Sequence, residues 1–351
     1  IDTSDVHTLM IAAAGTGKTT FFLEPNIEYC CAAGMSFIST DTKGDIYRNC
    51  GYVAAKRYGY KISVIDLRNP LKSDGINLLH LVKKYMDEHK NNPLNFSAKA
   101  KAERYANIVA DSIIAADGDK YGANTYFNDA AKGLIAALIL IIAEYGNDKE
   151  CHIVSVLKLM IELLEAKPQK KSQLKSETYF ADLIKLLPPE HKARWLSGAA
   201  INNADQAALS VISTALSRLN SLIDTETEQI LCFNTAIDTE TLCKEKCAVF
   251  IVLPEEDRTK YVIANLIIEQ ISREIYHIAD ENGGQLDKRI MIYFEEFGTM
   301  PPISGVEAMF SALRSRSVAI VAIIQSFAQL EKNYGKQGSE IIVDNTQLML
   351  F

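Results

Sequence analysis

The stretch Leu9–Thr20 carries the clearest chemical pattern in this chain. It is an apolar run followed by small residues that lead into Gly15-Thr16-Gly17-Lys18-Thr19. Loops of this composition hold phosphate groups, because small residues let backbone N–H groups curl around the oxygens and the following helix adds partial positive charge. We expect Lys18 to reach the β- and γ-phosphates of a nucleotide and the Thr19 hydroxyl to ligate Mg²⁺. The predicted phosphate-binding residues are Ala14, Gly15, Thr16, Gly17, Lys18, Thr19 and Thr20.

One position departs from the full phosphate-loop pattern. Ala12 stands where the pattern has its first glycine, five places before Gly17. Alanine tolerates positive φ less well than glycine, but a residue at the start of the loop that stays in the β region costs little. The alternative to a phosphate site is a glycine turn between a strand and a helix, with Lys18 solvated.

A second apolar run ends in two acidic residues. Ile290–Phe294 is followed directly by Glu295 and Glu296. In phosphate-loop hydrolases one carboxylate at such a strand end supports Mg²⁺, and the next orients and deprotonates the attacking water. We expect Glu295 to support the metal and Glu296 to act as the base. Aspartate is usual at the first position, and the longer Glu295 side chain suits a contact through water. The alternative is a pair of surface acids.

Polar residues flank another buried run, Val318–Ile324. Gln325 ends it, and an amide there could donate to a phosphate oxygen and accept from the attacking water, so that it would sense hydrolysis. Arg314 and Arg316 precede the run, and an arginine at a subunit edge can act on the γ-phosphate of a neighbouring subunit. The alternative roles are an ordinary polar strand end and arginines that favour a helix C-terminus.

The bulk composition is that of an ordinary globular protein. The chain has 351 residues, of which 48% are hydrophobic and 23% charged, with a net charge of −7. An acidic chain is not attracted to nucleic acid as a whole, so contacts with nucleic acid must be local. The seven cysteines form no CxxC pair, and the six histidines form no metal-ligand set, which favours reduced and partly buried thiols.

The elements around these residues alternate between apolar runs and helical patterns. This alternation, starting from a phosphate loop, predicts an α/β fold with a mainly parallel sheet and right-handed crossovers. Pro25 is expected to interrupt or end the helix that begins at Gly17. The predicted strands are His7–Ala12, Met35–Thr40, Lys61–Leu67, Cys247–Leu253, Ile290–Phe294, Val318–Ile324 and Thr346–Phe351.

Between about Asn77 and Thr241 the pattern contains helices only. An all-alpha insert over residues 148–227 is therefore predicted to interrupt a nucleotide-binding domain made of residues 1–147 and 228–351. The apolar helix Tyr126–Tyr145 is expected to pack back on the sheet. Its core, Gly133–Ala143, is too short to span a bilayer. Because the chain begins and stops inside its own pattern, we expect it to be a piece of a longer protein.

Several further blocks resemble the TraG-like coupling proteins of type IV secretion and bacterial conjugation. The likeness runs along nearly the whole chain and is weakest across about 148–245. The Asp-x-Lys-Gly and Gln-Ser-x-x-Gln-Leu blocks carry more specificity than the phosphate loop. Besides that loop, the blocks are Thr40–Tyr47, Gly59–Asp66, Tyr126-Phe127, Phe294–Gly298, Arg314–Arg316, Gln325–Leu330 and Tyr334-Gly335.

The resemblance implies a RecA-like ATPase that uses ATP and Mg²⁺ at the cytoplasmic face of the bacterial inner membrane. Such proteins are hexamers that bring relaxase-bound single-stranded DNA or protein effectors to the secretion channel. The interrupting helices would match the family's all-alpha domain, which is implicated in substrate recognition. The membrane helices of the family lie outside this sequence. Because hexamers of this family depend on that membrane region, a monomer is a plausible state of this piece.

Two other functions share these features. One is a substrate-docking adaptor that binds nucleotide and hydrolyses little, which the acidic balance, Ala12 and Glu295 motivate. The other is a double-stranded DNA translocase of the FtsK or HerA sort, which has the same type of ATPase site. The kind of DNA bound, and whether ATP is hydrolysed, distinguish the three.

Overall fold

The computed structural model describes residues 6–13, 15–115, 125–164, 179–198, 205–256, 260–303 and 305–351. The chain divides into two compact units. The first, the sheet unit, combines Ile1–Asp74 with Ala236–Phe351, and the second, the helical unit, is Gly75–Thr235. Each unit has its own core, so the two are described in turn.

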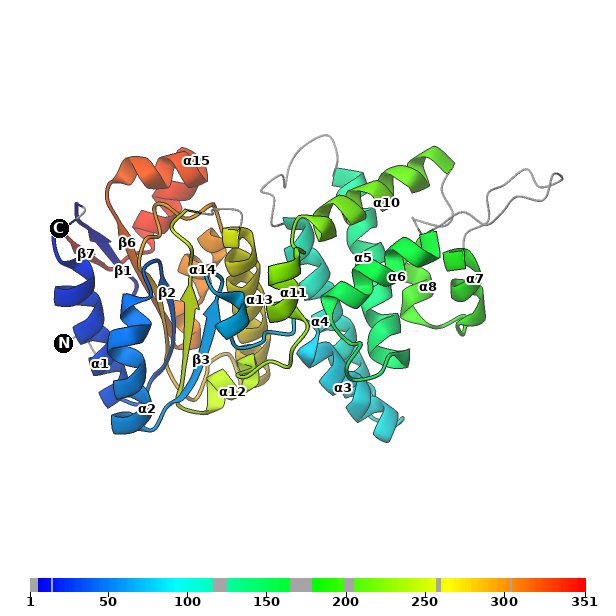
Figure 1. The fold of residues 1–351 in the computed structure, drawn as a ribbon, viewed down its shortest axis with the longest axis horizontal. Coiled ribbons are helices and arrows are strands. Elements are labelled where there is room, and N and C mark those ends of the chain that lie inside the picture. Colours follow the sequence, from blue (N-terminus) through cyan, green and yellow to red (C-terminus); the bar gives the residue numbers. More distant parts are fainter. Residues whose placement is uncertain are drawn as a thin grey trace. The chain divides into compact units, whose positions relative to one another are not determined.

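The sheet unit is built on seven parallel strands in the order β3-β4-β2-β5-β6-β1-β7 (Figure 1). The predicted parallel α/β fold is therefore confirmed. β6 lies between the strand that enters the glycine loop and the strand that ends in the two acids. All of the predicted apolar runs form strands: β1 Thr8–Ile11, β2 Ser36–Asp41, β3 Lys61–Asp66, β4 Cys247–Val252, β5 Ile290–Phe294, β6 Val318–Ile324 and β7 Leu348–Leu350.

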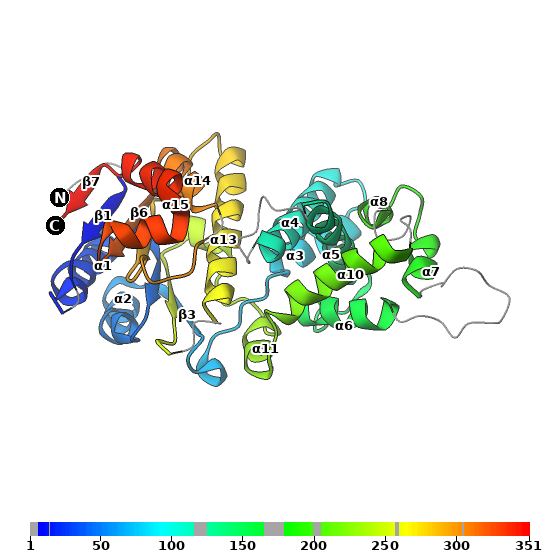
Figure 2. The same ribbon diagram turned by 90° about the horizontal axis from the view of Figure 1, so that it is seen from above.

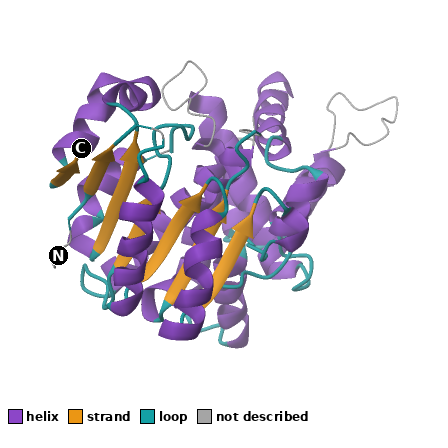
Figure 3. Ribbon diagram, turned by 60° about the vertical axis from the view of Figure 1, so that its left-hand side comes forward, coloured by secondary structure: helices purple, strands orange, loops and turns teal. Residues whose placement is uncertain are grey.

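Helices cover both faces of this sheet, and α1 and α2 cover one of them (Figure 3). On that face the rings of Phe37, Phe250 and Tyr293 pack edge to face, and Leu23 and Ile27 join them in the core. Full burial of such side chains is the main term that holds helix to sheet. The helical elements of the sheet unit are η1 Lys18–Leu23, α1 Glu24–Ala32, η2 Tyr47–Gly51, α2 Tyr52–Tyr58, η3 Pro70–Lys72, α12 Thr239–Lys244, α13 Tyr261–Glu281, α14 Val306–Ala312, η5 Arg314–Arg316 and α15 Phe327–Asp344.

Two helices differ from their predicted extents. Pro25 does not end the helix after the glycine loop: a π-helical turn, η1, leads directly into α1, and Pro25 occupies the first turn of α1, where a missing N–H is tolerated. The sequence pattern predicts a helix over Phe327–Tyr334 only, whereas α15 continues to Asp344. Gly335 takes a non-helical conformation (φ 68°), and it joins two helical segments at a kink.

The helical unit packs around one central apolar helix, α5 (Figure 2). α5 buries an almost continuous apolar run and contacts α3, α4, α6, α8 and α10. Gly133 lets α8 approach closely, because a Cβ there would lie 2.5 Å from the Leu196 carbonyl oxygen. The helices of this unit are α3 His80–Asn91, α4 Phe96–Ala115, α5 Thr125–Tyr145, α6 Ile153–Leu164, α7 Tyr179–Leu186, α8 Lys192–Leu196, α10 Asp205–Asn220 and α11 Thr225–Leu231.

The helical unit begins earlier than the predicted insert. It starts at Gly75 rather than at 148, and α5 belongs to its core rather than to a face of the sheet. The apolar character of α5 marked burial correctly but could not say against which partner. By length and composition alone α5 is also the one helix, among the described residues, that could cross a membrane, and 67% of its most apolar window is buried inside the protein.

Candidate active site

The glycine loop between β1 and η1 has the backbone shape that phosphate binding requires. Gly15 and Gly17 have positive φ of 77° and 79°, which only glycine adopts readily. Ala12 stays outside that region, since Ser317 is the sole described non-glycine residue with positive φ. Its N–H donates to the Ile324 carbonyl and prolongs the pairing of β1 with β6. Alanine therefore fits the first position of this loop. Ala14 lies outside the described residues.

Lys18 and Thr19 point from the start of η1 toward the carboxyl end of the sheet. Lys18 is buried, and its ammonium donates to the Ala12 carbonyl oxygen at 3.1 Å. It also lies 3.8 Å from the Glu296 carboxylate. The Thr19 hydroxyl donates to Glu295 Oε1 at 2.9 Å. Thr16 closes the loop by donating to the Ala13 carbonyl, and Thr20 is exposed.

Glu295 is buried and fully engaged by hydrogen bonds. Oε1 accepts from Thr19, and Oε2 accepts from both the backbone N–H and the hydroxyl of Thr42, at 2.9 and 3.1 Å. Its own N–H donates to the Thr40 hydroxyl. Three donors on one carboxylate hold it in a fixed orientation. Glu295 is thus a positioned carboxylate whose two oxygens already have hydrogen-bond partners.

Glu296 has the opposite environment. Its side chain is 24% exposed, and its two oxygens face Lys18 and the Gln325 amide, which donates to Oε2 at 3.4 Å. Gln325 is itself fixed, because its N–H donates to the Gln329 side-chain oxygen at the start of α15. The predicted residues Lys18, Thr19, Glu295, Glu296 and Gln325 are therefore brought together by β1, β5 and β6.

The two predicted arginines are not part of this group within the chain. Arg314 and Arg316 precede β6, whereas Gln325 follows it, so seven strand residues, or about 23 Å, separate them. Arg316 donates to the Ala312 carbonyl and to Asp280 and lies over the Tyr276 ring. Arg314 is exposed. A role toward a neighbouring subunit stays a prediction, and Arg314 is the better placed of the two to reach one.

The loop after β2 contacts the candidate site, because its Thr42 donates two hydrogen bonds to Glu295. Asp41 is buried and accepts from the N–H groups of Lys43, Gly44 and Tyr47, so it shapes the loop instead of facing a ligand. Burial raises the pKa of Asp41 to about 6, and the nearby Glu295 charge adds to the rise. The sequence indicated this loop but not Thr42 itself, whose contact with Glu295 depends on the pairing of β2 with β5.

The donor set fits a magnesium nucleotide. A hydroxyl and a carboxylate, Thr19 and Glu295, lie 2.9 Å apart beside a glycine loop, and hard oxygen ligands are what Mg²⁺ prefers. No cluster of three or more His, Cys, Asp or Glu side chains that could hold a metal occurs in the described residues. All seven cysteines are free thiols, and five of them are buried.

The fold resembles that of a conjugative coupling protein. The unbound form of the bacterial protein TrwBdeltaN70 matches with a TM-score of 0.65 and 14% identity over 98% of this chain and 67% of that chain. TrwB in complex with the ATP analogue ADPNP matches with a TM-score of 0.64 and 12% identity. TrwB with ADP and Mg²⁺ matches with 0.63 and 12%, and both cover 98% of this chain and 69% of that chain.

A comparison with curated protein sequences finds no significant match. The profile of the family described as type IV secretory system conjugative DNA transfer matches residues 2–351. The match confirms the resemblance that the Asp-Thr-Lys-Gly and Gln-Ser-Phe-Ala-Gln-Leu blocks predicted, and it extends across both the sheet unit and the helical unit. The chain therefore belongs to the type IV secretory system conjugative DNA transfer family, the coupling proteins.

Proposed function

We propose that the chain is the ATP-hydrolysing portion of a coupling protein that delivers relaxase-bound single-stranded DNA or protein effectors to a type IV secretion channel. The observation that carries the proposal is the convergence of Lys18, Thr19, Glu295, Glu296 and Gln325 at the carboxyl ends of β1, β5 and β6. Ligands of open parallel sheets bind at this edge. The complexes of TrwB with ADPNP and with ADP and Mg²⁺ support ATP and Mg²⁺ as the cofactors.

Each side chain has one task in this proposal. The loop N–H groups and Lys18 bind the phosphates, and Thr19 with Glu295 would hold Mg²⁺, which supplies positive charge to the phosphate oxygens. Glu296 orients the attacking water and takes its proton, because it is the carboxylate with free access. The Gln325 amide donates the hydrogen bond that orients Glu296. In this proposal the same amide also contacts the γ-phosphate. The Thr19 and Thr42 donors hold the Glu295 carboxylate in position.

Two substitutions test these roles. Lys18→Ala is expected to weaken nucleotide binding and to abolish turnover. Glu296→Gln is expected to keep nucleotide affinity while lowering the rate of ATP hydrolysis by at least about 100-fold, the usual contribution of a general base. Glu331→Gln changes an exposed glutamate of α15 and serves as the matched control. Unchanged turnover in both site variants would refute the assignment. If the wild-type chain binds nucleotide and does not hydrolyse it, the adaptor function is the correct one.

The partners are proposed on the same basis. In a bacterial cell the chain would act at the cytoplasmic face of the inner membrane, as a hexamer in its full-length form. We propose that the helical unit recognises the transferred protein, since it exposes large apolar side chains, among them Leu186 (83% exposed) and Trp195 (59%). Relaxase binding should weaken in Trp195→Ala and Leu186→Ala but not in Tyr52→Ala, which alters an exposed ring on the sheet unit. Equal binding by all three would exclude this surface.

A further inference from the structure

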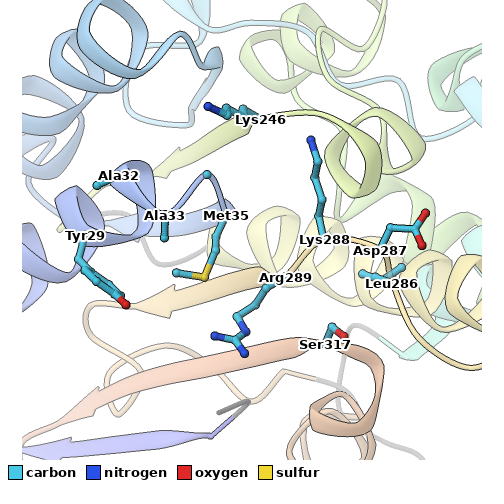
Figure 4. A pocket seen from close by; sticks show the side chains of 11 residues that line it. Tyr29, Ala32, Ala33, Met35, Lys246, Leu286, Asp287, Lys288, Arg289 and Ser317 are labelled. Atoms are coloured by element: carbon cyan, nitrogen blue, oxygen red, sulfur yellow. The ribbon is translucent and has the colours of Figure 1, made fainter. Parts of the chain in front are cut away.

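The sheet unit has a cavity at the edge opposite the candidate active site. Its volume is about 640 Å³, and it lies where β4, β2, β5 and β6 begin (Figure 4). Lys246, Met35, Arg289 and Ser317, the residues that directly precede these strands, all line it. We refer to this cavity as the amino-edge groove. Nothing in the proposed ATPase mechanism uses it.

Positive charge gathers in the amino-edge groove. Three cations line it, Lys246, Lys288 and Arg289, against the single acid Asp287, although the whole chain carries a net charge of −7. Among the described residues neither lysine has an acidic partner within ion-pair distance. The Lys246 stem lies over Gly34, where its Cε is 3.4 Å from the position of a Cβ. Local positive charge on an acidic protein indicates an anionic ligand.

The shape of the groove favours an extended anion over a single phosphate. The four strands are neighbours in the sheet, and three interstrand spacings of about 4.8 Å give a length of roughly 14 Å. Figure 4 shows Lys288 extending toward the Lys246 side and Arg289 extending the other way, toward β6, so the cations are spread along this length. Tyr29, which also lines the groove, is 39% exposed and offers an aromatic face.

We propose that the amino-edge groove binds single-stranded DNA, with Lys246, Lys288 and Arg289 on consecutive phosphates and Tyr29 against a base. Cationic grooves with aromatic side chains are the usual means of holding single strands without sequence preference. The choice of DNA over other polyanions rests on the proposed function, and the aromatic face argues for a nucleic acid over an acidic peptide.

The groove and the active site are joined by the same strands. Lys288 and Arg289 directly precede β5, and Glu295 and Glu296 directly follow it, so the five residues of the strand, about 17 Å, separate the two pairs. This separation means that DNA and nucleotide bind without competing. It also places a DNA contact at one end of the strand that carries both predicted catalytic carboxylates.

The test is the salt dependence of oligonucleotide binding by the 351-residue chain. A fluorescent single-stranded oligonucleotide is titrated at several salt concentrations without ATP. For single strands each lost phosphate contact lowers the slope of log K against log salt by about 0.7, so Lys246→Ala/Lys288→Ala should lower it by about 1.4. At 0.1 M salt this corresponds to about 25-fold weaker binding. Tyr29→Ala should weaken binding without changing the slope.

Lys56→Ala/Lys332→Ala removes two exposed lysines of the sheet unit that lie outside the groove, and it is expected to bind as the wild type does. Equal binding by both double variants, or no binding by the wild type, would overturn the proposal. If Lys246→Ala/Lys288→Ala loses binding to anionic vesicles or to polyglutamate but keeps its binding to the oligonucleotide, the proposal is also overturned, because the groove would then serve another ligand. Nucleotide binding, measured on the same proteins, tests the proposed ATPase separately from these results.

Discussion

Glu295 and Glu296 are adjacent in sequence, yet their surroundings give them different chemistry. The first is 5% exposed and receives three hydrogen bonds, and the second is 24% exposed beside a cation and an amide. Two of the three donors are side-chain hydroxyls, and that of Thr42, unlike that of Thr19, is not itself a proposed Mg²⁺ ligand. Thr42 is therefore a positioning residue for the carboxylate that would support Mg²⁺.

Thr42→Val keeps the size of the side chain and removes its hydroxyl. Loss of one hydrogen bond to a charged group costs about 1.5–3 kcal/mol, so we expect ATP turnover to fall by about tenfold or more and the Mg²⁺ concentration for half-maximal rate to rise. Thr42→Ser retains the hydroxyl and should restore both values. Steady-state hydrolysis measured across Mg²⁺ concentrations gives the answer. A valine variant with the magnesium dependence of the wild type would show that Thr42 has no such role.

The pKa of Asp41, raised by burial from 3.8 to about 6, predicts a dependence of stability on pH. The folded chain binds the Asp41 proton more tightly than the unfolded chain does, so stability falls as pH rises from about 4 to about 6. A shift of about two units corresponds to about 3 kcal/mol. Asp41→Asn removes this titration. Denaturant unfolding at pH 4 and at pH 7 should therefore show the wild type losing stability relative to the variant at the higher pH, whereas a constant difference would contradict the prediction.

At the scale of elements, apolar runs bounded by polar residues were enough to find all seven strands and the parallel fold. The order of the strands in the sheet could not be predicted in the same way. It depends on which strands pair, and pairing joins residues that are far apart in the sequence. Pro25 and α15 show the other limit. A proline is compatible with a helix when it falls in the first turn, and a glycine can join two helical segments, so neither residue fixes a helix boundary by its type alone.

Helix packing in the helical unit gives a prediction at the same scale. The contact of Gly133 with α8 involves the Leu196 backbone, which cannot move without moving the helix. Gly133→Ala should therefore destabilise the chain by about 1–3 kcal/mol, as overpacked cores do. Gly338→Ala, in α15, would meet Glu307 Oε1 and the Tyr334 Cβ at 3.0 Å, and the flexible glutamate can give way. Its cost should be smaller in thermal unfolding, and equal losses would contradict this comparison.

For the molecule as a whole, the sequence predicted a sheet-containing domain interrupted by an all-alpha insert, but it placed the start of the insert too late, at residue 148. The helix α5 was expected on the sheet, whereas it is the core of the unit that starts at Gly75. Hydrophobicity reports that a helix is buried and not what buries it. The same limit applies to the site. The types of Lys18, Thr19, Glu295, Glu296 and Gln325 indicated their chemistry, while Thr42 became visible only once β2 and β5 were paired.

The hydrogen bond from Thr19 to Glu295 has a consequence for how the site would respond to a metal ion. A hydroxyl has one proton to donate and two lone pairs with which to accept or ligate. Thr19 uses its proton on Glu295, so both lone pairs stay available for Mg²⁺, and the existing bond can persist when the ion arrives. The site is thus preorganised: the two groups are already oriented before binding, and the cost of ordering them is borne by folding rather than by the nucleotide.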